Sequence, residues 1–142
     1  MLMFAYGANT NINSMTMRCP DADYVGGFTL PDWRLVFRGV ADIEPEIGSE
    51  VLGVLWDITP KCERALDRFE GYPRLYGKQY FTVSVDPHNV EDVMFYKMNS
   101  NRYHLPADGY LRMINEGYRY SNLDLDPLYE AVRFTAREEY RG

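Results

Sequence analysis

Glu70 is the carboxylate whose place in the sequence best suits acid–base chemistry. It ends a segment with helical spacing, where backbone carbonyl groups already present partial negative charge, and Asp67 lies one turn earlier on nearly the same face. Both neighbours disfavour the ionised form, so we expect a raised pKa for Glu70, nearer the range that is useful to a general base. On position alone, a solvated glutamate at a helix end is the simpler interpretation.

The loop Tyr6-Gly7-Ala8-Asn9 is a second candidate, between a short apolar strand and a predicted helix. Gly7 and the small Ala8 let backbone N–H groups approach a ligand, and such groups favour a carboxylate or a developing oxyanion. An ordinary turn from strand to helix is the alternative interpretation.

Other chemistries find little support in the sequence. The two histidines, His88 and His104, are not spaced with Cys, Asp or Glu as metal ligands are, so no metal site is predicted. Cys19 and Cys62 lie far apart without a C-x-x-C motif; neither a disulfide framework nor a zinc site is indicated, and we expect both to be small hydrophobic residues of the core. The motifs G-x-S-x-G, G-x-x-x-x-G-K and G-x-G-x-x-G are absent, which argues against serine hydrolases, nucleotide hydrolases and dinucleotide enzymes.

Length and composition indicate a single globular domain spanning residues 1–142, with 46% hydrophobic and 25% charged residues. The net charge is −6 and no basic cluster offsets it, so nucleic acid and anionic membranes are not expected partners. The N-terminal apolar run has no basic lead and breaks at Gly7, too early for a signal peptide or a spanning helix. We therefore expect a soluble cytoplasmic protein.

The first half of the chain is predicted to be mainly extended. A strand at Leu2–Tyr6 is followed by a helix that Asn11 caps and Pro20 ends. Two strands at 24–30 and 33–37 flank a turn at Pro31-Asp32, a polar connection covers 41–49, and the apolar run at 51–58 is expected to be a central strand covered on both faces.

The second half alternates helix, hairpin and helices. Thr59 and Pro60 begin a helix that Gly71 ends, and strands at 79–85 and 90–98 are joined by a turn. From Pro106 the spacing is helical with a break at Ser121-Asn122, and the charged tail 137–142 is expected to fray. About six strands with interspersed helices predict an α+β domain whose sheet curls into a small barrel.

Four segments, taken together and in order, give the sequence a specific resemblance. They are Phe4-Ala5-Tyr6-Gly7-Ala8-Asn9, Met17-Arg18-Cys19-Pro20, Val51-Leu52-Gly53-Val54-Leu55-Trp56, and Leu66-Asp67-Arg68-Phe69-Glu70-Gly71-Tyr72-Pro73 with Tyr76. In these the chain resembles the γ-glutamylcyclotransferase family, and the resemblance extends over essentially its whole length.

The resemblance implies a small mixed β-barrel flanked by helices and a cofactor-independent enzyme. Such an enzyme releases the amine or amino acid from a γ-glutamyl amide and cyclises the glutamyl part to 5-oxoproline. By resemblance Glu70 is the catalytic acid–base, and Tyr6, Gly7, Ala8 and Asn9 bind the γ-glutamyl group of a small-molecule substrate. Tyr76 stands where the family often has a tyrosine, which assigns it to the pocket, with core packing as the alternative.

Two positions in the loop depart from the family pattern. Ala8 stands where serine is usual and Thr10 where leucine or methionine is common. Backbone binding survives both changes, so they bear on substrate preference more than on the site.

The leaving amine and the oligomeric state stay open at this point. The half of the pocket that receives the amine is expected from segments around Tyr103, Tyr110, Tyr118 and Tyr120. A non-catalytic binding or regulatory protein on the same fold is the alternative to an enzyme, because one fold hosts many functions.

Overall fold

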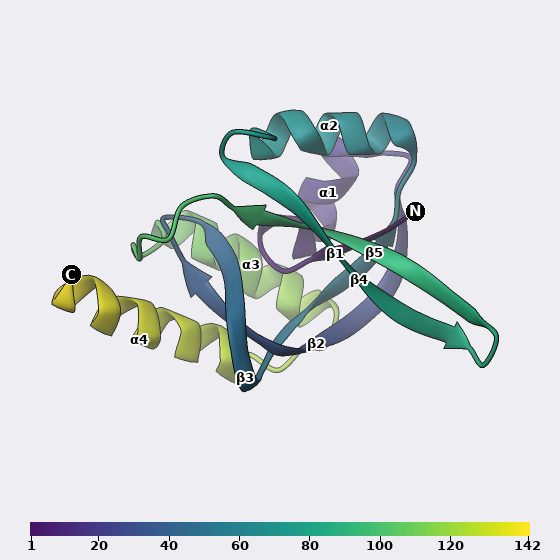
Figure 1. Cartoon of the computed structure of the whole chain (residues 1–142). Coiled ribbons are helices and arrows are strands. Elements are labelled where there is room, and N and C mark those ends of the chain that lie inside the picture. The colour runs from purple at the N-terminus through teal and green to yellow at the C-terminus, as the bar shows by residue number, and fades with distance from the viewer.

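The chain forms a twisted five-stranded sheet with helices on both faces (Figure 1). The computed structural model describes all residues from Met1 to Gly142. The elements in chain order are β1 (Leu2–Ala5), a 3-10 turn (Ala8–Thr10), α1 (Ile12–Arg18), β2 (Asp23–Phe37), β3 (Ala41–Asp57), α2 (Pro60–Glu70), β4 (Tyr76–Asp86), β5 (Asn89–Met98), α3 (Asp108–Tyr120) and α4 (Asp126–Arg141). None of these helices combines the length and the apolar character needed to cross a bilayer.

The strand order is β2-β3-β1-β5-β4. β1 lies in the middle and pairs antiparallel with β3 and parallel with β5. The two outer strands are hairpin partners of their neighbours, and the β4–β5 hairpin extends past the rest of the sheet at the right of Figure 1. The predicted apolar strand at 51–58 is the second half of β3, which has a partner on each side, as expected.

Alternating side chains of the inner strands supply two separate cores. In β1, Met3 and Ala5 pack with α1 and α2, whereas Phe4 packs on the opposite face with α3 and α4. β5 repeats this pattern, with Met94 on the first face and Phe95 on the second. The period of two along a strand thus builds three layers with the sheet in the centre.

The α+β class is confirmed, but the sheet is not a closed barrel. β2 and β4 each have a single partner and remain edge strands. They approach through side chains: the ring of Phe28 on β2 stacks on that of Phe81 on β4 with 5.6 Å between centroids, and Phe4 lies edge-on to both. Aromatic packing, rather than backbone hydrogen bonding, therefore closes this side of the core.

Two predicted interruptions are parts of long strands. Pro31 and Asp32 form a bulge within a continuous β2, where Asp32 has a φ of 63° and the register shifts. The predicted polar connection at 41–49 is the first half of β3, paired with Trp33–Phe37 of β2. Because the predicted strands at 24–30 and 33–37 form one continuous β2, the sheet has five strands rather than six.

The predicted helix boundaries are largely confirmed. Asn11 accepts a hydrogen bond from Ser14 N at 3.0 Å, Thr59 caps α2 through Cys62 N at 3.1 Å, and Gly71 has the left-handed φ of 67° that ends this helix. The tail was expected to fray, yet α4 continues to Arg141.

Two contacts explain why α4 stays helical to its last turn. Thr135 is buried and accepts from Phe37 N at 3.0 Å, and Arg141 pairs with Glu138 at 3.0 Å. The first contact docks α4 on β2, and the second adds support within the last turn.

Candidate active site

A pocket of about 210 Å³ lies at the end of β1, lined mainly by apolar and tyrosine side chains. The residues selected from the sequence all line this one pocket: Tyr6, Gly7, Ala8, Asn9, Glu70 and Tyr76. They come from the loop after β1, the end of α2 and the start of β4. The fold therefore brings together segments that lie as much as 70 residues apart in the chain.

Glu70 is the last residue of α2 and the one charged residue in the pocket lining. Burial raises its pKa to about 7, and the nearby Arg18 guanidinium opposes the rise. The expected direction is therefore present, but its cause is burial rather than the helix end and Asp67. Asp67 instead pairs with Lys78 at 2.9 Å.

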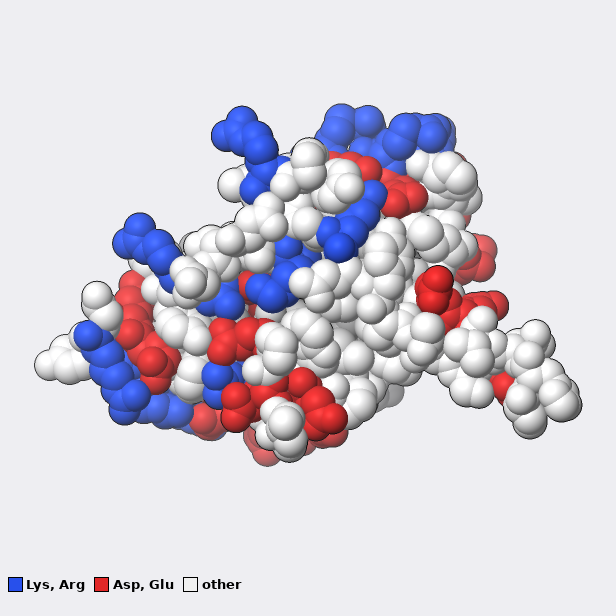
Figure 2. Space-filling model, viewed as in Figure 1, with Lys and Arg blue, Asp and Glu red and all other residues white.

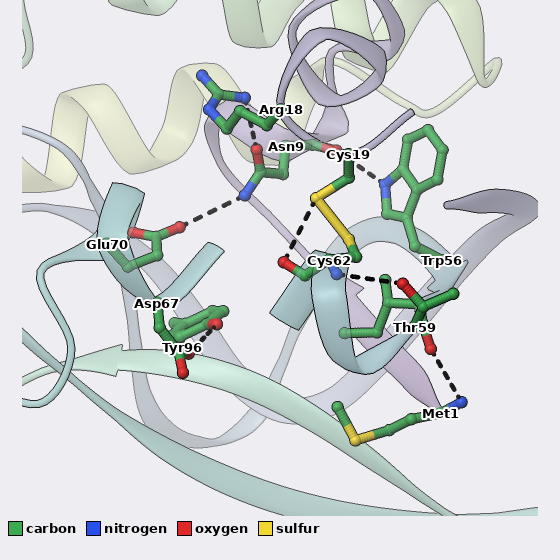
Figure 3. The surroundings of a disulfide bond; sticks show 11 residues. Met1, Asn9, Arg18, Cys19, Trp56, Thr59, Cys62, Asp67, Glu70 and Tyr96 are labelled. Atoms are coloured by element: carbon green, nitrogen blue, oxygen red, sulfur yellow. Dashed lines mark hydrogen bonds between the residues drawn. A yellow bond between two sulfur atoms is a disulfide. The ribbon is translucent and has the colours of Figure 1, made fainter. Parts of the chain in front are cut away.

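Asn9 connects Glu70 to a cation (Figure 3). Its Nδ2 donates to Glu70 Oε1 at 3.4 Å, and its Oδ1 accepts from Arg18 Nη1 at 2.8 Å. The guanidinium accepts no hydrogen bonds, so its bond to Asn9 Oδ1 fixes the orientation of the amide with Nδ2 towards Glu70. Arg18 appears in the sequence only as part of a motif, and this role could not be read from spacing.

The loop at residues 7–10 presents unpaired backbone donors. Thr10 Oγ1 donates to Gly7 O at 2.7 Å, and Trp56 Nε1 donates to Asn9 O at 2.9 Å. The carbonyl oxygens of Gly7 and Asn9 are therefore already hydrogen-bonded within the protein. The N–H groups of Gly7 and Asn9 make no hydrogen bond within the protein, whereas that of Ala8 is directed at the hydroxyl oxygen of Tyr110. This arrangement suits an anionic oxygen in the pocket.

Gly7 is required by close packing at this loop. A Cβ at this position would lie 2.9 Å from the Cβ of Ala41 and 3.0 Å from the hydroxyl oxygen of Tyr110. The backbone of the loop therefore approaches β3 and α3 more closely than any other residue type allows.

Two of the selected tyrosines are anchored by their hydroxyl groups. Tyr6 donates to Tyr96 O at 2.6 Å, and Tyr76 donates to Ala41 O at 2.9 Å. Burial is the main cause that raises the pKa of both hydroxyls, so they stay protonated. Their rings line the pocket, and their hydroxyl groups are hydrogen-bonded to backbone carbonyl oxygens of the protein.

A buried ionic cluster supports the wall behind Tyr6. Asp42 is fully buried and accepts from Arg38 Nε at 2.6 Å, Lys97 Nζ at 2.8 Å and Met98 N at 3.0 Å. The Tyr6 hydroxyl lies 3.4 Å from the same carboxylate. The paired cations compensate a carboxylate that burial would otherwise make costly.

Of the C-terminal tyrosines expected around the pocket, only Tyr110 lines it. Tyr103 donates to Glu44 at 2.9 Å, Tyr118 donates to Leu52 O in the core, and Tyr120 is 63% exposed. Other lining residues that the sequence did not indicate are Val40, Ala41, Leu75 and Tyr96. They carry no motif, and only the fold places them here.

The two cysteines form a disulfide, contrary to the expectation of two separate core thiols (Figure 3). Both are buried, as predicted, but the end of α1 meets the start of α2, which brings their Cα atoms to 5.1 Å. That separation is typical of a disulfide, and a sequence separation of 43 gives no sign of it.

Charged side chains outside the pocket are mixed in sign on the face shown in Figure 2, with basic atoms gathered over α2 and acidic atoms at the lower edge, by the bend of β3. No group of three or more His, Cys, Asp or Glu side chains in the structure is arranged to hold a metal ion.

Comparisons with known proteins agree with this fold and pocket. The sequence model of the family described as "Gamma-glutamyl cyclotransferase, AIG2-like" matches residues 3–118. A Bos taurus protein named gamma-glutamylcyclotransferase is 28% identical over 138 residues, which cover 88% of this chain and 73% of that protein.

Solved structures add a similarity of fold. A protein named gamma-glutamyl cyclotransferase has a TM-score of 0.79 at 24% identity, covering 92% of this chain and 85% of its own. An AIG2-like protein from Mus musculus has a TM-score of 0.58 at 20% identity, covering 78% and 81%.

Proposed function

The chain belongs to the gamma-glutamyl cyclotransferase, AIG2-like family and is an enzyme of that type, and we propose that Glu70 is its general acid–base. In the proposed reaction a small γ-glutamyl amide is converted to 5-oxoproline and a free amine or amino acid. The observation that carries this proposal is a single half-buried carboxylate with a pKa of about 7 in a pocket that the Tyr6–Asn9 loop also lines.

The α-amino nitrogen of the substrate attacks its own γ-carbonyl carbon and forms the ring bond. Glu70 as a carboxylate accepts the proton that this nitrogen loses, and then delivers it to the leaving nitrogen as the amide C–N bond breaks. A pKa near neutrality suits a group that must both accept and donate. The protein is regenerated unchanged, and the proton count balances.

The loop and the apolar walls supply the rest of the catalysis. The unpaired N–H groups of Gly7 and Asn9 are suited to bind the carboxylate of the glutamyl group or the oxyanion formed at the γ-carbon. The attack is intramolecular because both groups belong to one substrate molecule, and holding that molecule folded keeps the amine and the carbonyl in the geometry that the attack needs. Tyr76 forms part of the wall that holds this folded shape.

The test is detection of 5-oxoproline by mass spectrometry after incubation with a panel of γ-glutamyl amino acids and γ-glutamyl amines. Glu70→Gln keeps the side-chain shape and removes the base, so we expect product from wild type and a loss of at least about 100-fold in the variant. Glu63→Gln is the matched control, since it makes the same change on the same helix away from the pocket.

Each outcome has a clear meaning. Glu70→Gln activity within about tenfold of wild type would exclude Glu70 as the proton carrier. If folded wild-type protein yields no 5-oxoproline from the panel, the alternative of a non-catalytic binding protein gains ground, and the same compounds would be screened by thermal shift.

A further inference from the structure

Two large apolar side chains, those of Phe69 and Leu75, line the pocket and yet are left largely uncovered by the protein. Phe69 is 47% exposed and Leu75 is 60% exposed, whereas the other large hydrophobic side chains of the lining are buried or half-buried. Exposed apolar surface at a groove is typical of a place where a ligand binds. Phe69 and Leu75 therefore form an apolar rim that a substrate in the pocket would cover.

This rim flanks Glu70. Phe69 precedes Glu70 in α2, and a Cβ on Gly71 would lie 2.9 Å from Leu75 Cδ1, so the Leu75 side chain lies over the residue that follows Glu70. In the proposed reaction Glu70 delivers a proton to the leaving nitrogen, which requires that nitrogen to come within hydrogen-bond reach of the carboxyl group. The substituent on the leaving nitrogen is then the part of the substrate nearest the rim.

The Leu75 side of the rim is fixed in the free protein by Asn99. Its Nδ2 donates to Pro73 O at 2.9 Å and to Arg74 O at 2.7 Å, and its backbone N–H donates to Leu75 O at 3.0 Å. Leu75 N in turn donates to Gly71 O at 2.9 Å. Because the loop is already ordered, an apolar group that packs on Leu75 loses little of its binding energy to ordering the protein.

The rim offers no partner to a charged leaving group. Glu70 is the one charged residue in the lining: as a carboxylate it would repel another carboxylate, and an ammonium group would oppose the protonated form that delivers the proton. The Arg18 guanidinium lies outside the lining, where it bonds Asn9 and covers the ring of Phe69. A charge placed on the rim would lose water without gaining a counter-charge.

We propose that Phe69 and Leu75 bind the leaving group, and that the enzyme selects γ-glutamyl substrates whose leaving nitrogen carries an uncharged, apolar substituent; this inference rests on the proposed function. The γ-glutamyl group is common to all such substrates. Preference among them is therefore set where the leaving group lies, by the rim.

The test uses γ-glutamyl amides that differ only in the leaving amine, which is methylamine, pentylamine, 1,5-diaminopentane or 5-aminopentanoic acid. Formation of 5-oxoproline gives kcat/KM for each. We expect the pentylamide to exceed the methylamide at least about tenfold, since each methylene buried contributes about fourfold. The two amides with a charged end should be at least about tenfold poorer substrates than the pentylamide.

Variants of Leu75 separate a role in selection from a role in structure. Leu75→Ser should lower kcat/KM for the pentylamide at least about fivefold and retain that for the methylamide. Leu105→Ser is the matched control, because Leu105 is also exposed but lies outside the pocket, and it should retain both values. Leu75→Arg adds a cation to the rim and should raise the ratio of the carboxylate-ended amide to the pentylamide at least about tenfold. Circular dichroism establishes that the variants are folded.

The wild-type series decides the proposal even without the variants. Values of kcat/KM for the pentylamide and the two charged amides that agree within about threefold overturn it, and so does a loss in Leu75→Ser that is equal for the pentylamide and the methylamide. Both results leave the cyclotransferase activity in place. A folded wild type that forms no 5-oxoproline from any of these amides, the methylamide included, overturns the proposed function and this inference together.

Discussion

The guanidinium of Arg18 lies over the ring of Phe69, with 3.5 Å between Cζ and the ring centroid. Arg18 ends α1 and Phe69 is the penultimate residue of α2, so this cation–π contact joins the ends of two helices. It holds a positive charge close to Glu70, the next residue in the chain, and leaves Nη1 free to bond Asn9. The ionisation of Glu70 therefore depends on a residue outside the pocket lining.

Arg18→Gln should move the acidic limb of the kcat/KM profile to higher pH. Burial raises the pKa of Glu70 to about 7 and Arg18 lowers it, so losing this charge raises the pKa further and a higher pH is needed to form the carboxylate. The other ionisable groups that face Glu70 are tyrosines, neutral at this pH: Tyr6, Tyr76, Tyr96 and Tyr110. Arg18→Lys keeps the charge and should stay closer to wild type; coincident profiles for Arg18→Gln and wild type would refute this coupling.

Glu70→Gln should be more stable than wild type above pH 7. The pKa of Glu70 is about 7 in the folded protein and about 4.3 in an unfolded chain, so its contribution to stability is complete below the lower value and is lost as pH rises through the higher one. The full loss is of the order of 3 kcal/mol. Urea unfolding of both proteins at pH 5 and pH 8 measures it, and an equal difference in stability at the two pH values would show that Glu70 is not destabilised by burial.

Gly7→Ala should impair catalysis more than stability. The added methyl group would meet Ala41 and the Tyr110 hydroxyl, so the loop must shift away from the pocket wall. Displacements of about 1 Å at such sites lower rates by about 100-fold. Gly109→Ala, where an added Cβ would lie no nearer than 3.9 Å to its nearest neighbour, is the matched control and should retain kcat/KM. Wild-type kinetics for Gly7→Ala would show that the close approach is not needed.

Removing the Cys19–Cys62 disulfide should lower the free energy of unfolding by about 2–4 kcal/mol, since the bridge closes a long loop in the unfolded chain. Urea unfolding with and without a phosphine reductant, compared with the Cys19→Ala/Cys62→Ala variant, measures this loss. Identical midpoints under oxidising and reducing conditions would contradict the expected contribution.

Local rules predicted what is local in this structure. Asn11, Thr59 and Gly71 cap their helices through contacts within a few residues, and the turn between β4 and β5 is equally short-range. The site residues were found because family motifs mark Glu70 and the loop before α1. The pocket that unites them could only be expected from the resemblance.

The errors arose where distant contacts decide the outcome. Residues 41–49 look like a polar loop, but Ala41 and Ile43 are buried against the core and Asp42 is neutralised by Arg38, which stabilises a strand there. The disulfide depends on how α1 meets α2.

The bridge between Cys19 and Cys62 also shortens the covalent route across the pocket. Along the backbone, Asn9 and Glu70 are separated by 61 positions, a stretch that contains all of β2 and β3. Through the bridge, Asn9 is ten positions from Cys19 and Glu70 is eight from Cys62. A protease cut in the exposed stretch of β3 at residues 45–48 would therefore leave both halves of the pocket on one covalently connected molecule. Nicked protein would run as a single species on a denaturing gel until it is reduced.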